Sequence, residues 1–112
     1  AEINEPFSPD LVVLDGIDAF VDGGPATGKR VKGNVFLASN DRIAVDAAGV
    51  AVLKELGSSR SIMDKRIFHQ KQISRAVDLG LGVSSPSEID LVPADPKSQE
   101  FCDRVKSILM ND

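Results

Sequence analysis

The sequence predicts a small layered α/β domain, and three observations support this fold class. Hydrophobic residues make up 42% of the 112 residues and charged residues 27%, a balance typical of globular domains. Strand-like apolar runs come first, and helix-like patterns follow them. The expected order of elements is β-β-α-α-β-α, which favours helices layered on a sheet. Because the length suits one hydrophobic core, residues 1–112 are expected to form a single domain.

Three segments are typical of strands. Residues 11–14 form a continuous apolar run, and an alternating pattern resumes after an irregularity at Asp15-Gly16. Residues 34–39 predict a second strand and residues 89–92 a third. Between the first two, residues 23–28 contain three Gly and one Pro, which predicts a loop.

Three helices are predicted. Residues 41–56 repeat apolar side chains every three to four positions and are rich in Ala, so this helix is expected to approach its neighbours closely. A Gly follows at the position that suits a helix C-terminus. The pattern Ser61-x-x-Asp64 predicts the start of a second helix that runs to about Leu79. A terminal amphipathic helix is expected to open at Asp95-Pro96, a capping residue followed by proline.

Charge and cysteine content restrict the possible partners. A formal net charge of -4 works against binding nucleic acid, whose phosphates require a basic surface. The single cysteine, Cys102, excludes an internal disulfide and fits the reducing cytoplasm. Because no apolar run approaches the roughly 20 residues needed to cross a bilayer, no membrane is expected as a partner. The chain starts at Ala1 and enters strand-like sequence quickly, so we expect a fragment of a longer protein.

The pattern Gly23-x-x-x-x-Gly28-Lys29 resembles a phosphate-binding P-loop. Arg30 stands where a Ser or Thr should hold Mg²⁺, and strand-like residues follow in place of the required helix. A nucleotide P-loop is therefore not expected. Two readings stay open, an anion-binding loop that uses Lys29, Arg30 or backbone amides, and a glycine-rich connection between strands.

Carboxylates are frequent in the first half of the chain: Asp15, Asp18, Asp22, Asp41 and Asp46. Such groups can bind Mg²⁺ or Ca²⁺, or act as acid and base. Alternatively, Asp41 caps the first helix and Asp46 pairs with Arg42 on its surface. Asp46 is the more suggestive residue, because its apolar neighbours predict a largely buried helix in which a carboxylate would need compensation.

The remaining chemistry-bearing residues are weaker candidates. The second predicted helix carries basic residues and the only histidine, His69, a pattern typical of a solvated face and, less often, of a surface for an acidic partner. Cys102 lies beside Phe101 on the terminal helix, which favours a buried small side chain over a nucleophile.

An ordered set of short motifs resembles a known family. The motifs are Asp15-Gly16-Ile17, Gly24-Pro25 with Gly28, Leu37-Ala38-Ser39, Asp41-Arg42-Ile43-Ala44-Val45-Asp46 and Gly80-Leu81-Gly82. From about Asp10 to Val92 the chain resembles domain-of-unknown-function family 362, in particular the C-terminal half of that domain. Arg42 departs from the Pro common in the family. The resemblance implies a redox-associated prokaryotic protein, linked with ferredoxin-like iron–sulfur modules, and implies no established reaction.

A single cysteine cannot hold an iron–sulfur cluster, so any cluster must belong to the remainder of a full-length protein or to a ferredoxin-like module. The site hypothesis combines the glycine and carboxylate features. The expected ligand-binding residues are Asp15, Gly24, Pro25, Gly28, Lys29, Asp41 and Asp46, with Asp15, Asp41 and Asp46 as ligands of a possible divalent metal. The alternative is a structural or docking domain with no site of its own. Convergence of the three aspartates in one pocket distinguishes the two.

Overall fold

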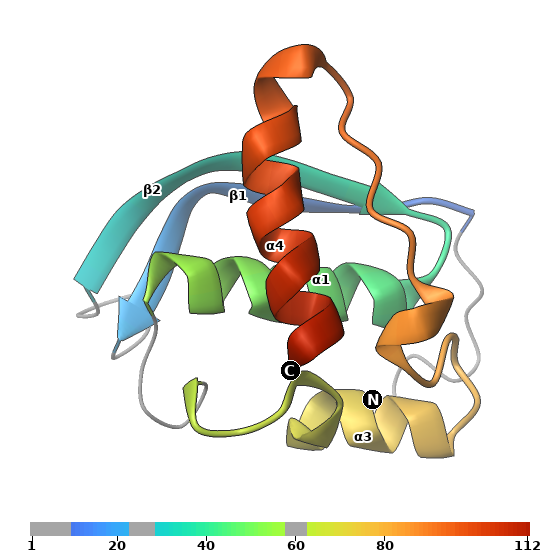
Figure 1. Ribbon diagram of the computed structural model, residues 1–112. Coiled ribbons are helices and arrows are strands. Elements are labelled where there is room, and N and C mark those ends of the chain that lie inside the picture. The colour runs from blue at the N-terminus through green and yellow to red at the C-terminus, as the bar shows by residue number, and fades with distance from the viewer. Residues whose placement is uncertain (1–9, 23–28, 58–62) are drawn as a thin grey trace.

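The computed structural model describes residues 10–22, 29–57 and 63–112, and within these ranges the side chains of 10–15 and of 35 onward. A hairpin of β1 (Val12–Asp22) and β2 (Lys29–Ser39) lies over helix α1 (Arg42–Leu56), as Figure 1 shows. Helix α3 (Lys71–Asp78) lies below α1, and helix α4 (Gln99–Asn111) crosses α1. The mixed α/β class predicted from the sequence is confirmed.

The two strands pair antiparallel, with Val12 opposite Ser39 and Leu14 opposite Leu37. The register shifts between Gly16 and Asp18, which confirms the irregularity expected there. Strand β2 starts at Lys29, five residues earlier than residue 34, where the sequence pattern predicted it. The extension has a simple cause, because ladder hydrogen bonds to β1 use backbone groups and do not require apolar side chains.

Helix α1 is the centre of the core and confirms the sequence prediction. The Asp41 side chain caps its start by accepting a hydrogen bond from the Ala44 N–H, and Gly57 closes it with φ of 80°. The helix approaches β1 closely at Gly49. A Cβ atom at this position would lie 2.8 Å from the Leu14 side chain. The core around α1 consists of Ile43, Ala47, Ala51, Val52, Ile67, Ile73, Ile89, Val105 and Leu109.

The second helix differs from its prediction. In place of one helix to about Leu79, a short 3-10 helix, η2 (Ile67–His69), precedes α3. Gln70, with ψ of 133°, interrupts the helical path between them. Ser61 of the predicted capping box lies outside the described residues. The last turn of α3 is followed by Gly80, with φ of 71°.

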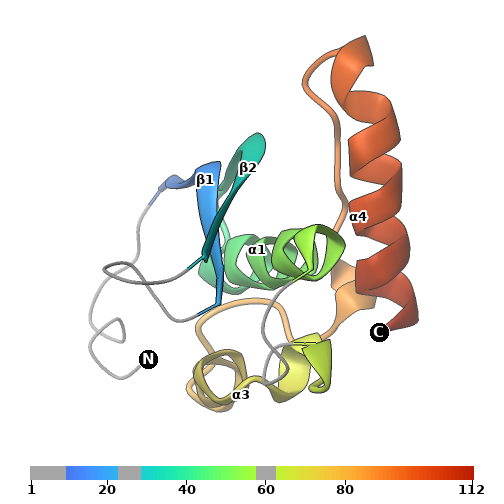
Figure 2. The same ribbon diagram turned by 90° about the vertical axis from the view of Figure 1, so that its left-hand side faces the viewer.

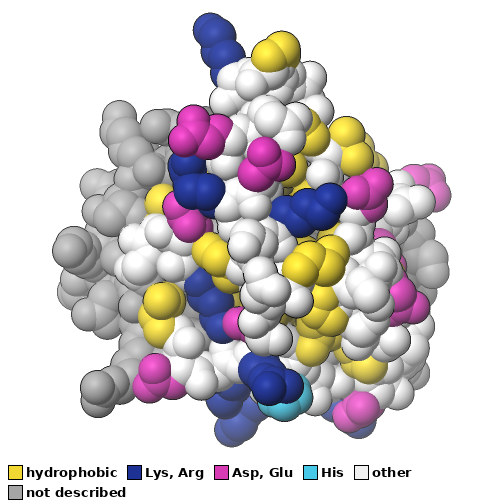
Figure 3. Space-filling model, viewed as in Figure 1, with side chains coloured by type: hydrophobic (Ala, Val, Ile, Leu, Met, Phe, Trp, Pro, Cys, Tyr) yellow, Lys and Arg dark blue, Asp and Glu magenta, His cyan; other side chains and the backbone are white. Residues whose placement is uncertain are grey.

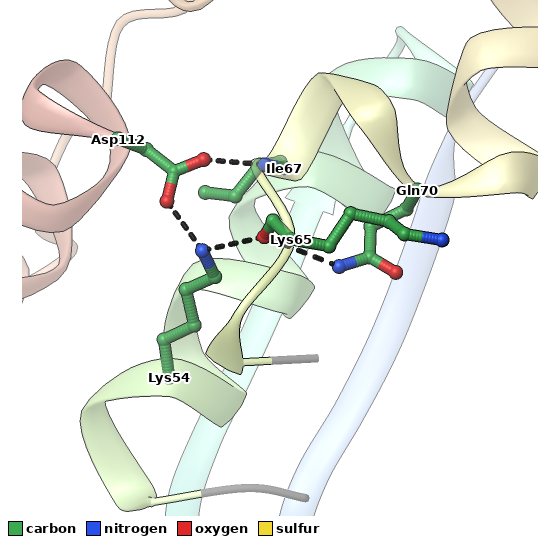
Figure 4. Close-up of polar contacts among 5 residues, drawn as sticks. All are labelled: Lys54, Lys65, Ile67, Gln70 and Asp112. Atoms are coloured by element: carbon green, nitrogen blue, oxygen red, sulfur yellow. Dashed lines mark hydrogen bonds and ion pairs between the residues drawn. The ribbon is translucent and has the colours of Figure 1, made fainter. Parts of the chain in front are cut away.

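A set of contacts to the end of the chain, shown in Figure 4, lies at the start of η2. The Asp112 carboxylate accepts hydrogen bonds from the Lys54 ammonium and from the Ile67 N–H. Lys54 also donates to the Lys65 carbonyl at 2.8 Å. These contacts occupy the backbone groups just before η2, so a continuous helix is disfavoured there.

The third predicted strand, residues 89–92, is not a strand. The sheet of the described residues has two strands, and residues 89–92 run beside α4 without joining that sheet. Ile89 is buried in the core, whereas Val92 is 76% exposed. The segment is held by a contact to α4, in which the Cys102 thiol lies 3.6 Å from the Leu91 carbonyl. Pro93 adds to the effect because it lacks the N–H that a ladder needs.

The C-terminal helix opens as predicted. Asp95 accepts a hydrogen bond from the Ser98 N–H at 2.9 Å, Pro96 begins the short 3-10 helix η4 (Pro96–Ser98), and α4 follows directly. Another short 3-10 helix, η3 (Pro86–Glu88), lies earlier in the same connection. Among the described residues, every helix is too short or too polar to cross a membrane.

Candidate functional site

Asp41 lies at the junction of two segments that are distant in sequence. One carboxylate oxygen, Oδ1, accepts from the Ala44 N–H at 2.9 Å, and Oδ2 accepts from the Val83 N–H at 3.0 Å. The Asp41 N–H donates to the Ser39 hydroxyl at 3.0 Å. Asp41 therefore caps α1, which is the alternative to metal binding that the sequence analysis considered for this residue. It also holds the start of α1 against the segment that follows α3.

Asp46 lies one turn further along α1 and lines a cavity of about 260 Å³. The other residues around the cavity are Val12, Arg42, Ile43, Gln72, Ala76 and Leu81. Although Asp46 is exposed as a whole, the part of its carboxyl group that faces the cavity wall loses water, and this burial raises its pKa above 3.8.

The surroundings of Asp46 differ from the expectation of a compensated, buried carboxylate. The neighbouring side chains of Val45, Ala47 and Ala48 are indeed buried, but Asp46 itself faces outward between them. Within the described part of the chain, its carboxylate makes no hydrogen bond and no ion pair, and the expected pair with Arg42 is not formed. The group is therefore available to a ligand.

Asp15 lies on β1 opposite Phe36 and is exposed. Of the three aspartates proposed as metal ligands, Asp46 lines the cavity and Asp15 and Asp41 do not. Within residues 10–22, 29–57 and 63–112, no three His, Cys, Asp or Glu side chains form a group that could hold a metal ion. The structure therefore does not bring Asp15, Asp41 and Asp46 together in one metal-binding group.

The glycine-rich part of the predicted site lies outside the described residues. This concerns Gly24, Pro25 and Gly28. Lys29 is the first residue of β2, and its side chain is not described, as for Asp18 and Asp22 on β1. Their predicted roles in ligand binding stay predictions.

A larger groove of about 750 Å³ was not predicted from the sequence. It is lined by residues of β2, α1, α4 and the segment 91–98. Figure 2 shows β2 and α4 facing each other on one side of α1. Phe36, 61% exposed, and Val92, 76% exposed, lie along it. Hydrophobic side chains gather beside α4 in Figure 3. The sequence gives no local indication of this groove, because residues 34–39 have the pattern of a fully buried strand.

The charged side chains around this groove are mostly paired. Arg104 bonds Glu55 at 2.8 Å and Glu100 at 3.3 Å, and its guanidinium lies 5.5 Å from the centre of the Phe101 ring. Lys97 also lines the groove, and its ammonium has no partner in the described part of the chain. The groove therefore combines apolar side chains with charged ones, and one cation is available at its edge.

Cys102 is half-buried and His69 is exposed. Burial and, less strongly, the charge of Asp103 raise the pKa of the half-buried Cys102 thiol, so it stays protonated at neutral pH. His69 is exposed on η2, among the basic side chains at the lower edge of Figure 3. The basic residues of this region, Lys65, Arg66, Lys71 and Arg75, are exposed.

Comparison with known proteins relates the first half of the chain to a family. Residues 1–51 match the family model of a domain of unknown function, DUF362. This match supports the DUF362 family for a segment that contains β1, β2 and most of α1. All seven expected ligand-binding residues lie within it, whereas Gly80-Leu81-Gly82 lies beyond it. No curated protein and no solved structure matches the chain.

Proposed function

We propose that this chain contributes a binding site for a small polar ligand in the cavity at Asp46. The observation that carries the proposal is a carboxylate that lines a cavity and has no hydrogen-bond partner among the described residues. A carboxylate that loses water without gaining a partner is costly, and a ligand donor removes that cost. The raised pKa of Asp46 has the same cause.

The residues that line the Asp46 cavity indicate which class of ligand it suits. Val12, Ile43, Ala76 and Leu81 offer apolar surface, and Asp46 accepts hydrogen bonds. A small molecule with an N–H or O–H donor and a short apolar body fits this combination. The Gln72 amide adds a donor on the same cavity, so a second, electron-rich group on the ligand is favoured.

A ligand screen with a matched pair of variants tests the proposal. The probes are small amides, amines, amino alcohols and zwitterionic amino acids, with Mg²⁺ and Ca²⁺ as additional arms, and binding is measured by ligand-observed NMR. Asp46→Asn should abolish binding of any hit. Asp78→Asn is the control, because Asp78 is also exposed on a helix and lies outside the cavity. Binding that survives Asp46→Asn, or that is lost equally in both variants, contradicts the proposal.

We also propose that the chain is part of a longer, cytoplasmic, redox-associated protein whose iron–sulfur cluster lies in another segment or in a ferredoxin-like module. The motif resemblance and the DUF362 match over residues 1–51 support this assignment. The test is to purify the longer polypeptide without oxygen and to measure iron and acid-labile sulfide. A longer polypeptide that contains neither, and that binds no ferredoxin-like protein, argues against it.

A docking role is the second candidate function, and a separate observation favours it. The apolar groove between β2 and α4 is larger than the Asp46 cavity and contains strongly exposed Phe36 and Val92 side chains. Exposed apolar surface of this kind commonly marks a protein-binding surface.

A further inference from the structure

The groove follows the open edge of the sheet. Four consecutive residues of β2, Val35 to Ala38, line it. Because strand side chains alternate between the two faces, consecutive residues share a groove only when it follows the edge of the strand. Figure 2 shows β1 on the side of β2 away from α4. The edge of β2 that does not pair with β1 therefore faces the groove.

This edge carries unused hydrogen-bonding groups. In the two-stranded sheet of the described residues, β2 pairs with β1 along one edge. Alternate N–H and C=O groups of β2 consequently point away from β1, toward α4. Residues 89–92, whose sequence is strand-like, pack beside α4 and leave these groups unpaired. The edge is a template for one further strand.

The walls of the groove suit an extended apolar segment. Val52 and Leu56 of α1 lie along it beneath the hairpin, and Phe101 and Val105 of α4 lie opposite β2. A strand in this position would place alternate side chains against α1 and leave the others toward solvent. Phe36 and Val92, both strongly exposed, would be partly covered by the added strand.

The charged residues that line the groove favour one kind of incoming segment. Arg104 forms ion pairs with Glu55 and Glu100, and the Asp95 carboxylate, which keeps its negative charge, accepts hydrogen bonds from the Ser98 N–H and hydroxyl. Lys97 is the cation without a partner among the described residues that line the groove. A carboxylate on the incoming segment complements it.

From these observations we propose that the groove between β2 and α4 binds an extended, apolar peptide segment that carries a carboxylate. The segment adds as a third strand to the free edge of β2, and its carboxylate pairs with Lys97. This surface is separate from the Asp46 cavity, since the two share no lining residue. The inference rests on the docking role proposed for this groove and does not depend on the proposed ligand site.

A set of designed peptides tests strand addition on the intact 112-residue chain. The probe is a soluble, fluorescently labelled peptide of alternating valine and threonine that ends in glutamates, and its affinity is measured by anisotropy. A twin with N-methylated backbone on its pairing edge keeps the side chains but cannot complete the ladder. We expect it to bind at least about tenfold more weakly, because several backbone hydrogen bonds are lost together. Equal affinity of the two peptides overturns strand addition.

The location of the peptide is tested by hydrogen exchange. Alternate amides between Val35 and Ala38 should exchange more slowly when the glutamate-ended peptide is bound, because only the outward-facing groups gain partners. The Asp78→Asn variant should bind the peptide with unchanged affinity, since Asp78 is exposed and lies outside the groove. Protection that appears elsewhere and leaves these amides unchanged overturns the proposed site.

A charge swap tests the role of Lys97. A lysine-ended twin should bind about threefold more weakly than the glutamate-ended peptide, the size expected for an exposed ion pair. Lys97→Glu should reverse this order, and the side chain is exposed, so the variant should fold normally. An unchanged order overturns the ion pair. Failure of every peptide to bind, together with dimerisation of the chain through the β2 edge, overturns the proposal in favour of a second copy as the occupant.

Discussion

The Asp41 carboxylate lies directly against Gly82, where a Cβ atom would come within 2.9 Å of the Asp41 Cγ. The absence of a side chain at residue 82 lets Asp41 reach the Val83 N–H. This contact ties the start of α1 to the segment that follows α3, and both Asp41 and Gly82 belong to motifs singled out in the sequence.

Gly82→Ala should therefore lower the free energy of unfolding by about 1–3 kcal/mol, the usual cost of forcing extra volume into a packed site. Urea unfolding measures the loss. The same substitution in an Asp41→Ala background should cost clearly less, since the clashing carboxylate is gone. An equal cost in both backgrounds would show that the conflict lies elsewhere.

Asp112→Ala should be one of the more destabilising single substitutions in the chain, with a loss of about 3 kcal/mol. Lys54 and Asp112 have side-chain exposures of only 9% and 11%, so the variant leaves an ammonium and the Ile67 N–H without their partner in a nearly buried position. Arg104→Ala is the control, since its ion pair with Glu55 is 49% and 26% exposed and should contribute below about 1 kcal/mol. Similar losses for the two variants in thermal unfolding would contradict the assignment.

The stability contributed by Asp46 should fall as pH rises. Burial raises the pKa of this carboxyl group in the folded chain above its ordinary value of 3.8, so the unfolded chain ionises first. The stabilisation is full below pH 3.8 and is lost as pH rises through the folded pKa. Asp46→Asn should accordingly raise the unfolding free energy slightly at neutral pH, by at most about 0.5 kcal/mol because the side chain is exposed. The difference should vanish below pH 3.8, and a gain that persists there would refute this cause.

The chain purified alone should be colourless and contain no iron–sulfur cluster, because Cys102 is its only cysteine. Iron and sulfide analysis together with visible absorption tests this. Stoichiometric iron and sulfide in the isolated chain would disprove the prediction and require ligands other than cysteine thiolates.

ATP and GTP should not bind at Gly23 to Lys29 with affinity of about 1 μM or better. Arg30 replaces the Mg²⁺-binding hydroxyl, and Lys29 begins strand β2 in place of a helix. Calorimetry with Mg²⁺ present is the measurement, and Lys29→Ala is the comparison variant. Saturable heat that disappears in this variant would reinstate the P-loop.

Much of the fold was predictable because its signals are local. The cap at Asp41, the terminating Gly57 and the Asp95-Pro96 start of the last helical segment act within a few residues of themselves, and all three behave as predicted. The irregularity near Gly16 is likewise confirmed. The α/β class was predictable for the same reason, because it follows from the helix and strand periodicity of apolar residues.

The candidate site was predictable only in part. The sequence singled out Asp41 and Asp46 but not their separate surroundings, because their spacing on one helix does not specify what packs beside each. Asp41 meets a partner 42 positions away, at Val83, and Asp46 meets the walls of a cavity formed with α3. The groove at β2 gave no local signal, since Phe36 has the sequence context of a buried residue.

The amino-acid sequence by itself thus determined the fold class, the first two strands, the first and last helices and the single-cysteine restriction on cofactors. The tertiary structure alone decided that residues 89–92 leave the sheet, that the chain turns at Gln70 and that the edge of β2 faces an apolar groove. The physical reason is the range of the interactions. Caps and periodic patterns act over a few residues, whereas the ion pair of Lys54 with Asp112 joins residues 58 positions apart, and only the folded chain brings them together.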